Sequence, residues 1–293
     1  MKRLTRVELE CDNEATSQLA INLSRRPYLD RRIILRTPPN NFPRFLYKYL
    51  GPGLKDEWLR DILIDSKLYL RSPTDFNDPF DMRGHIIDEL NIRKKRDYLE
   101  AMIKQMAPHL TWKQRNSHLN RLMVDTNLFE KLKKSLITVV KNHGISCFSI
   151  KPRSILMWSH YGQHHKGIAL QFEYAKDVIN FQFTLPIEYR KDYPTIEYYG
   201  DPSRHKEFVL RKYEDWSYEK EWRLVRHEKA NTYHSFDSAA LTGIILGCRI
   251  DPQEEDRVRA MIMERDKLGL GRLKLYKARL HEFKYRLVIC KTQ

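Results

Sequence analysis

Short apolar runs separated by turn residues recur along this chain and constrain its fold more than any other feature. GISCFSI (144–150), GIALQFEY (167–174) and LTGIILGCRI (241–250) are each apolar enough for an internal strand. FLYKYL (45–50) and EWRLVRH (221–227) add aromatic and β-branched residues of the kind that strands favour. The runs therefore predict a β-sheet assembled from distant parts of the chain.

Helical patterns surround these runs. LKDEWLRDILIDS (54–66) places Leu54, Trp58 and Ile62 on one face, and residues 251–269 begin with an Asp-Pro start signal. Residues 86–142 show apolar residues at helical spacing over most of their length. We therefore predict an α+β fold, with a mainly antiparallel β-sheet, a basic helical insertion at about 86–142 and flanking helices.

The first 43 residues differ from the rest of the chain. They are polar and Arg-rich, and they end in TPPNNFP, which cannot continue a helix. We expect an N-terminal arm or extension over residues 1–43 and a single α+β domain over residues 44–293.

The chain is strongly basic, with 53 Lys or Arg against 38 Asp or Glu and a formal charge of +15. A surplus of this size attracts polyanions such as nucleic acid. Residues 91–141 contain twelve Lys or Arg and four Asp or Glu, so the helical insertion is either a nucleic-acid-binding surface or a solvated helical face. The residues we expect to contact nucleic acid are Arg93, Lys94, Lys95, Arg96, Lys131, Lys133 and Lys134.

Several classes of protein are disfavoured by what the sequence does not contain. The four cysteines, at 11, 147, 248 and 290, form no Cys-x-x-Cys pair, which fits a reducing cytoplasm. No apolar run approaches the roughly 20 residues that span a bilayer, and the first residues have no apolar signal-peptide core. We expect a cytoplasmic protein without a membrane partner. The P-loop, Rossmann, zincin and GxSxG signatures are also missing.

The densest group of polar residues lies in LMWSHYGQHHKGIALQF (156–172). His160 and His164 would share one face of a helix, but no acidic residue stands beside them, so we predict no metal site. Ser159, His160, His165 and Lys166 could instead donate to an anion. The alternative is a buried His–Tyr hydrogen-bond network at a junction between helix and strand.

A second group lies in WSYEKEWRL (216–224), where aromatic and charged residues alternate. In an extended strand, Glu219 and Glu221 point to the same face. The two carboxylates could act at the oxocarbenium-like centre of a sugar. A salt bridge between Glu221 and Arg223 is the alternative. The loop TDFNDPFD (74–81) either forms a simple turn or presents Asn77 or Asp78 to the same pocket.

Together, LYKYL, LYLRSPTDFNDPFD, ISCFS, LMWSHYGQHHKGIALQF and WSYEKEWRL resemble, in this order, a bacterial family known only as domain of unknown function 2971. The resemblance covers about residues 45–225. The layout also resembles that of ADP-ribosyltransferases in outline. That second resemblance implies a split β-sheet and NAD as the cofactor.

The resemblance to ADP-ribosyltransferases also implies roles for individual residues. Glu221 would act on the nicotinamide ribose with help from Glu219, and Lys48 would hold a phosphate or ribose of the cofactor. The catalytic candidates are Glu221, Glu219, His160 and Tyr161. The cofactor-binding candidates are Tyr47, Lys48, Asn77, Asp78, Ser159, His165 and Arg223.

Three functions remain open at this point. The first is an NAD-dependent ADP-ribosyltransferase-like enzyme that modifies a macromolecule, with nucleic acid indicated by the charge, in a toxin or phage-defence setting. The second is a non-catalytic module of a defence system that binds nucleic acid or a partner protein. The third is a metal-independent nuclease that uses His160 and His165.

Overall fold

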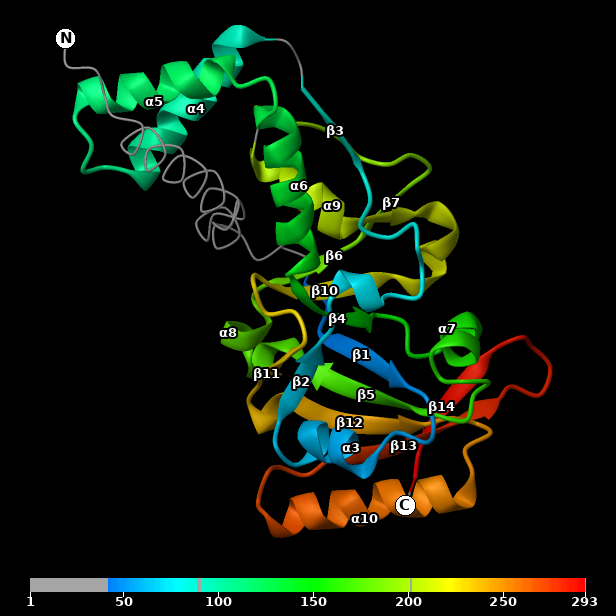
Figure 1. Ribbon diagram of the computed structural model, residues 1–293. Coiled ribbons are helices and arrows are strands. Elements are labelled where there is room, and N and C mark those ends of the chain that lie inside the picture. Colours follow the sequence, from blue (N-terminus) through cyan, green and yellow to red (C-terminus); the bar gives the residue numbers. More distant parts are fainter. Residues whose placement is uncertain (1–41, 89–90, 201, 293) are drawn as a thin grey trace.

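The computed structural model describes residues 42–88, 91–200 and 202–292. Almost all of the predicted N-terminal arm, residues 1–43, therefore lies outside the described residues. A central sheet lies between helices on one side and a helical block on the other (Figure 1).

One eight-stranded sheet forms the centre of the molecule. Neighbouring strands are antiparallel, except that β12 and β13 run parallel. This arrangement confirms the predicted α+β class with a mainly antiparallel sheet. In spatial order the strands are β14 (Leu287–Lys291), β13 (Lys274–Leu280), β12 (Leu241–Leu246), β5 (Ile168–Glu173), β1 (Phe45–Leu50), β4 (Gly144–Ser149), β10 (Glu221–Arg226) and β6 (Thr184–Pro186).

The apolar runs of the sequence occupy the middle of this sheet because both of its faces are covered there. On one face, Leu46, Phe172 and Ile244 from three adjacent strands join the main core, which α3 (Asp56–Leu63) and α10 (Pro252–Lys267) cover. On the other face, Trp158 of α7 (Ile155–His160) packs with Tyr47. Successive side chains of a strand point to opposite faces of the sheet and therefore pack into two separate cores.

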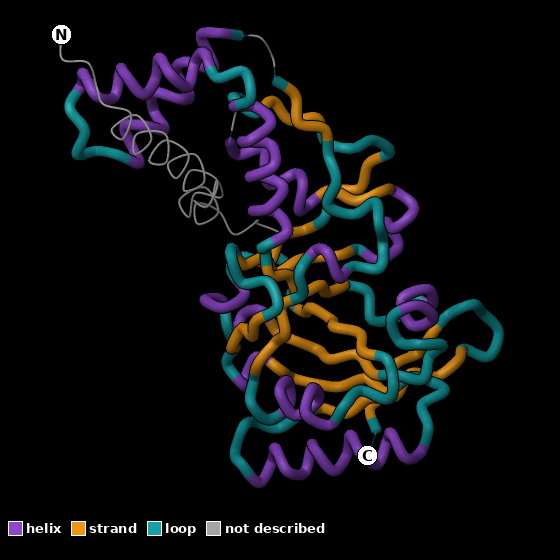
Figure 2. The backbone as a smooth tube through the Cα atoms, viewed as in Figure 1, coloured by secondary structure: helices purple, strands orange, loops and turns teal. Residues whose placement is uncertain are grey.

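Three helices fill the expected helical insertion: α4 (Ile92–Met106), α5 (Trp112–Val124) and α6 (Leu128–Lys141). Thr111 begins α5 with a capping box, and the Asn91 side chain caps α4. Their apolar faces share a core with α9 (Glu207–Leu210) and with β8 (Thr195–Glu197), which pairs with β3 (His85–Ile87). Figure 2 shows this helical block at one end of the sheet and α10 at the other.

The remaining elements are short and lie outside the eight-stranded sheet. β2 (Lys67–Leu70) pairs with β11 (Thr232–Ser235), and β7 (Glu188–Arg190) pairs in parallel with β9 (Arg211–Tyr213). α8 (Val178–Phe181) precedes β6.

The extended strand considered for WSYEKEWRL (216–224) forms only in its second half. Residues Glu214–Glu219 form a 3-10 helix, η4, and the strand begins at Glu221. Lys220 between them has a left-handed backbone (φ 45°), so Glu219 does not belong to the alternation of β10. Its carbonyl accepts a hydrogen bond from Ser149 Oγ (2.5 Å), and its buried carboxylate has partners of its own. These tertiary contacts override the alternating pattern.

Gly167 lies where β5 enters the sheet beside the end of β1. A Cβ atom at this position would overlap the carbonyl oxygen of Leu50, which is backbone and cannot move aside easily. We expect Gly167→Ala to lower the free energy of unfolding by about 2 kcal/mol or more, as measured by urea denaturation. Gly269→Ala is the control, because that position is left-handed (φ 68°) but open. It should cost only about 1 kcal/mol of backbone strain, and equal losses would contradict the steric argument.

Candidate functional site

Five charged side chains form a buried group between β10, β9 and the 78–81 loop. We call it the ion cluster; its members are Asp81, Lys212, Glu219, Glu221 and Arg223. Their side chains are between 0% and 6% exposed. Charges removed from water to this degree persist only when they are paired and hydrogen-bonded.

Arg223 holds two carboxylates at once. Its Nε donates to Glu221 Oε1 (2.6 Å), and its Nη1 and Nη2 donate to the two oxygens of Asp81 (3.1 and 2.5 Å). Nη1 also donates to the carbonyl of Val209 (2.8 Å). The guanidinium therefore ties strand β10 to α9 and to the loop that contains Asp81. Such two-pronged pairing fixes geometry as well as charge.

Lys212 is the second cation of the cluster and contacts both glutamates. Its Nζ donates to Glu219 Oε2 (2.6 Å) and to Glu221 Oε2 (3.1 Å). The hydroxyl of Tyr161 donates to the remaining Glu219 oxygen (2.5 Å). Tyr161 and Glu219, which are 58 positions apart in the chain, thus meet at one carboxylate.

The two glutamates titrate in opposite directions. Burial raises the pKa of Glu219 to about 7, even though Lys212 acts against the shift. Burial alone would also raise the pKa of Glu221, but Arg223 and Lys212 hold that pKa well below its ordinary value. Glu221 is therefore a fixed anion, whereas Glu219 can exchange a proton near neutral pH.

A pocket of about 340 Å³ opens beside the ion cluster. We call it the cationic pocket. Five Lys or Arg side chains and four aromatic rings line it, with only two acidic side chains. The lining consists of Asp78, Phe80, Arg83, Arg190, Lys191, Asp192, Tyr193, Pro194, Arg211, Lys212, Tyr213 and Trp216.

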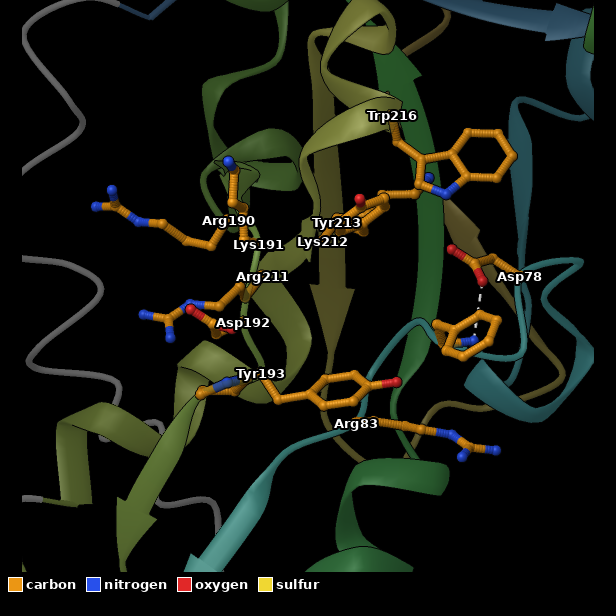
Figure 3. Close-up of a pocket in the computed structure, with 12 residues that line it drawn as sticks. Asp78, Arg83, Arg190, Lys191, Asp192, Tyr193, Arg211, Lys212, Tyr213 and Trp216 are labelled. Atoms are coloured by element: carbon orange, nitrogen blue, oxygen red, sulfur yellow. Dashed lines mark hydrogen bonds between the residues drawn. The ribbon is translucent and has the colours of Figure 1, made fainter.

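Three segments build the pocket. The parallel pairing of β7 with β9 sets Tyr189 opposite Lys212 and brings the residues after each strand to the same edge. η4 supplies Trp216, and the 78–83 loop forms the opposite wall. Figure 3 shows Arg190 and Arg211 on one side of the pocket, with Asp78 and Trp216 on the other.

Not all of the pocket's cations are neutralised. Arg83 is exposed and has no ion-pair partner among the residues that the structure describes. Arg211 pairs with Glu207 (2.8 Å), but its buried Nε has no hydrogen-bond partner in that part of the chain. Lys212 lines the pocket and also contacts Glu219, so it connects the pocket to the ion cluster.

Of the residues singled out from the sequence, four meet in or at the ion cluster: Glu219, Glu221, Tyr161 and Arg223. Asp78 is buried and lines the cationic pocket, where its carboxylate accepts the backbone N–H of Phe80 (2.9 Å). The salt bridge between Glu221 and Arg223 exists, but it belongs to a larger network that includes Lys212.

Two other candidates lie on β1, away from the pocket. Lys48 shares a face with Leu46 and Leu50, on the core side of the sheet, and donates to Ser146 Oγ (2.9 Å). Glu221 lies on the opposite face, since its neighbour Trp222 packs in that core. The hydroxyl of Tyr47 donates to Gln171 (3.4 Å).

The other candidates surround α7 and the 74–81 loop. His160 is exposed, and its Nδ1 contacts the Tyr218 hydroxyl (2.8 Å). Ser159 contacts His165 Nε2 (3.2 Å). Asn77 does not line the cationic pocket. α7 ends at His160 and His164 has a left-handed backbone (φ 60°), so the helical face that His160 and His164 would need does not form.

The sequence patterns singled out neither Asp81 nor any of the five cations that line the pocket, Lys212 among them. A signal existed in two similar segments, YRKDYP (189–194) and LRKYEDW (210–216), which both combine Arg-Lys with aromatic residues. The strand pairing of β7 with β9 brings these segments together. Asp81 could not be distinguished from the other acidic residues of its loop.

Several basic residues of the helical insertion are engaged within the protein. Lys94 pairs with Glu197 (3.0 Å), Lys131 pairs with Asp125 (2.9 Å), and Lys95 lies over the ring of Tyr199.

In the described ranges, no group of three or more His, Cys, Asp or Glu is placed to hold a metal ion. No helix in those same ranges is long and apolar enough to cross a membrane.

Comparison with known proteins identifies one similarity. Residues 157–224 match the model of a family described as "Protein of unknown function (DUF2971)", which confirms the family resemblance for this segment. The matched segment contains Tyr161, Lys212, Glu219 and Glu221, and so most of the ion cluster. No curated protein and no solved structure matches the chain.

The raised pKa of Glu219 predicts a specific pH dependence of stability. Because this pKa is about 7 in the folded protein and 4.5 ordinarily, the folded state binds the proton more tightly between these values. The stabilisation is complete below pH 4.5 and is lost as the pH rises through 7. We expect the free energy of unfolding of the wild type, measured by urea denaturation relative to that of Glu219→Gln, to fall between about pH 5 and pH 8 by up to about 1.4 kcal/mol per pH unit. His143, His165 and His234, whose pKa values burial lowers, are present in both proteins, so their contributions cancel.

Glu219→Gln should remove this dependence, because the amide cannot ionise. Glu214→Gln, in the same 3-10 helix, is the matched control and should keep the wild-type slope. The low pKa of Glu221 acts only below its ordinary value of 4.5, outside this window. If Glu219→Gln keeps the wild-type slope, Glu219 is not the group that titrates.

Proposed function

We propose that the protein binds a nucleotide in the cationic pocket. The observation that carries this proposal is the combination of five cations with four aromatic rings in one pocket of about 340 Å³. A nucleotide needs both: cations for the phosphates and flat rings for the base. A pocket for a purely apolar ligand would not need the cations.

The cations of the pocket suit phosphate groups. Arginine donates two parallel hydrogen bonds to phosphate oxygens, and Arg190 and Arg211 both lie on one wall. Arg83 is exposed and has no ion-pair partner in the described chain, so it can bind an anion without first giving up a protein partner. Arg190 pairs with Glu188, and Arg211 pairs with Glu207.

The aromatic residues suit a base. Trp216 is partly buried, and the ammonium of Lys212 lies 4.8 Å from the centre of its ring. Phe80 is 64% exposed and Tyr193 is 37% exposed, so both rings can be covered by a ligand. Stacking of one base on an aromatic side chain contributes about 1–3 kcal/mol.

Isothermal titration calorimetry with AMP, ADP and NAD tests the binding. We expect Arg83→Ala to weaken the binding of each nucleotide about tenfold, as the removal of one charged hydrogen bond predicts. Arg272→Ala removes an exposed arginine outside the pocket and should leave the affinity unchanged. The proposal is wrong if no nucleotide binds, or if inorganic phosphate binds as tightly as AMP.

We further propose ADP-ribosyl transfer from NAD as the activity that such binding would serve. Glu219 favours this candidate, because it contacts the pocket residue Lys212 and has a pKa of about 7. In the transfer, a nucleophile of the target attacks C1′ of the nicotinamide ribose, and nicotinamide leaves with the bonding electrons. Glu219 is buried and does not line the pocket, so the proton released by the nucleophile would reach it through Lys212, which lines the pocket and donates to Glu219. Glu221 is held by two cations, so its role is to fix Lys212 and Arg223.

Release of nicotinamide from NAD in the presence of nucleic acid or protein targets measures this activity. We expect Glu219→Gln to reduce release by about 100-fold or more, as for the removal of a proton acceptor, while calorimetry still detects NAD binding. If the wild-type protein binds NAD but never releases nicotinamide, the transferase proposal fails and nucleotide binding remains.

A further inference from the structure

The hairpin formed by β13 and β14 ends in an exposed aromatic tip. Leu280 is 75% exposed, Phe283 81% and Tyr285 103%. These are among the most exposed large apolar side chains in the described residues. Figure 1 shows the tip projecting beside α7, away from α10.

The tip is an ordered loop. The backbone N–H of His281 donates to the carbonyl of Arg286 (2.9 Å) and closes the loop, and the N–H of Phe283 donates to His281 Nδ1 (3.1 Å). The base of the hairpin is fixed as well, since Ala278 and Leu287 pack with Trp158 of α7. The rings of Phe283 and Tyr285 are thus exposed to solvent on an ordered loop.

The hairpin that carries these rings is rich in cations. Residues 274–291 contain six Lys or Arg and one acidic residue, Glu282. Lys277 pairs with Glu255 (2.6 Å). The other five have no ion-pair partner among the residues that the structure describes: Lys274, Arg279, Lys284, Arg286 and Lys291. In the helical insertion, Lys94 and Lys131 are paired with acidic side chains of the protein.

The hairpin is connected to the cationic pocket by α7 and η4. Trp158 of α7 packs with the hairpin, while His160, the last residue of α7, and Tyr161 contact Tyr218 and Glu219 of η4. η4 also carries Trp216, which lines the pocket. α7 and η4 therefore lie between the hairpin and the pocket.

We propose that the hairpin tip binds single-stranded nucleic acid, with bases stacked on Phe283 and Tyr285 and phosphates held by Lys284 and Arg286. This inference rests on the proposed nucleotide binding, because it places one nucleotide of the strand in the cationic pocket. Aromatic rings interleaved with cations are the usual means of binding single strands without sequence preference.

The arrangement of the tip favours nucleic acid over a lipid surface. A segment that inserts into a membrane presents a contiguous apolar face, but Lys284 separates Phe283 from Tyr285 and Glu282 precedes them. Stacking needs only separate rings with cations between them. The cationic pocket also combines aromatic rings with Lys or Arg. This likeness supports nucleic acid as the partner of the tip.

Fluorescence anisotropy with a labelled oligothymidylate and an oligouridylate tests the inference, each of about 20 nucleotides, longer than the roughly 4–16 that one groove covers. We expect the double variant Phe283→Ser with Tyr285→Ser to bind at least about tenfold more weakly, because the bases can no longer stack. Lys284→Glu with Arg286→Glu should reduce the slope of log affinity against log salt by about 0.7 for each phosphate that is no longer neutralised.

Ile179→Ser is the matched control, since Ile179 is 76% exposed on α8 and far from the hairpin in Figure 1. Its affinity for both oligonucleotides should equal that of the wild type. Calorimetry with AMP separates the two proposals: the hairpin variants should bind AMP normally, whereas Arg83→Ala should not.

Three results would overturn the inference. The wild type and the hairpin variants could bind oligonucleotides equally, even though AMP binds in the pocket. The wild type could bind no oligonucleotide at all. Vesicles of phosphatidylcholine with phosphatidylserine could bind the wild type but not the hairpin variants, with no oligonucleotide binding, and the tip would then be a membrane contact.

Discussion

The buried guanidinium of Arg223 is the interaction on which the candidate site depends. It joins Asp81 of a loop, Val209 at the end of the helical block and Glu221 on the central sheet. Removing one member of such a group leaves an uncompensated buried charge, at a cost of about 3–5 kcal/mol. The group therefore fixes how three segments lie together, and two of these segments continue directly into walls of the cationic pocket.

Lys212 belongs to the ion cluster and also lines the cationic pocket, so the cluster fixes one of the pocket's cations. One side of its ammonium contacts Glu219 and Glu221, and the other faces the ring of Trp216. Because its partners are buried, the position of this cation is set before any ligand arrives, which lowers the entropic cost of binding. Glu219 differs from the rest of the cluster, since its raised pKa leaves it able to change charge near neutral pH.

The pocket and the hairpin tip share one chemical character although they come from distant parts of the chain. Both combine aromatic rings with Lys or Arg, and α7 with η4 connects them. The positive charges of the sequence are therefore not equally available to a ligand. Some lysines of the helical insertion are paired with the protein's own acids, whereas five cations of the hairpin have no such partner in the described ranges.

The sequence by itself determined the α+β class and the strands made from apolar runs, because burial on both faces of a sheet requires continuous apolar residues. It also identified Glu219, Glu221, Tyr161 and Arg223, since polar residues beside such runs stand out. It could not show that Lys48 and Glu221 lie on opposite faces of the sheet, nor that Asp81 and Lys212 complete the ion cluster. Those facts depend on strand order and on the left-handed turn at Lys220. Only tertiary structure decides them, because a charge becomes a partner when folding brings it within a few ångströms of its opposite and excludes water.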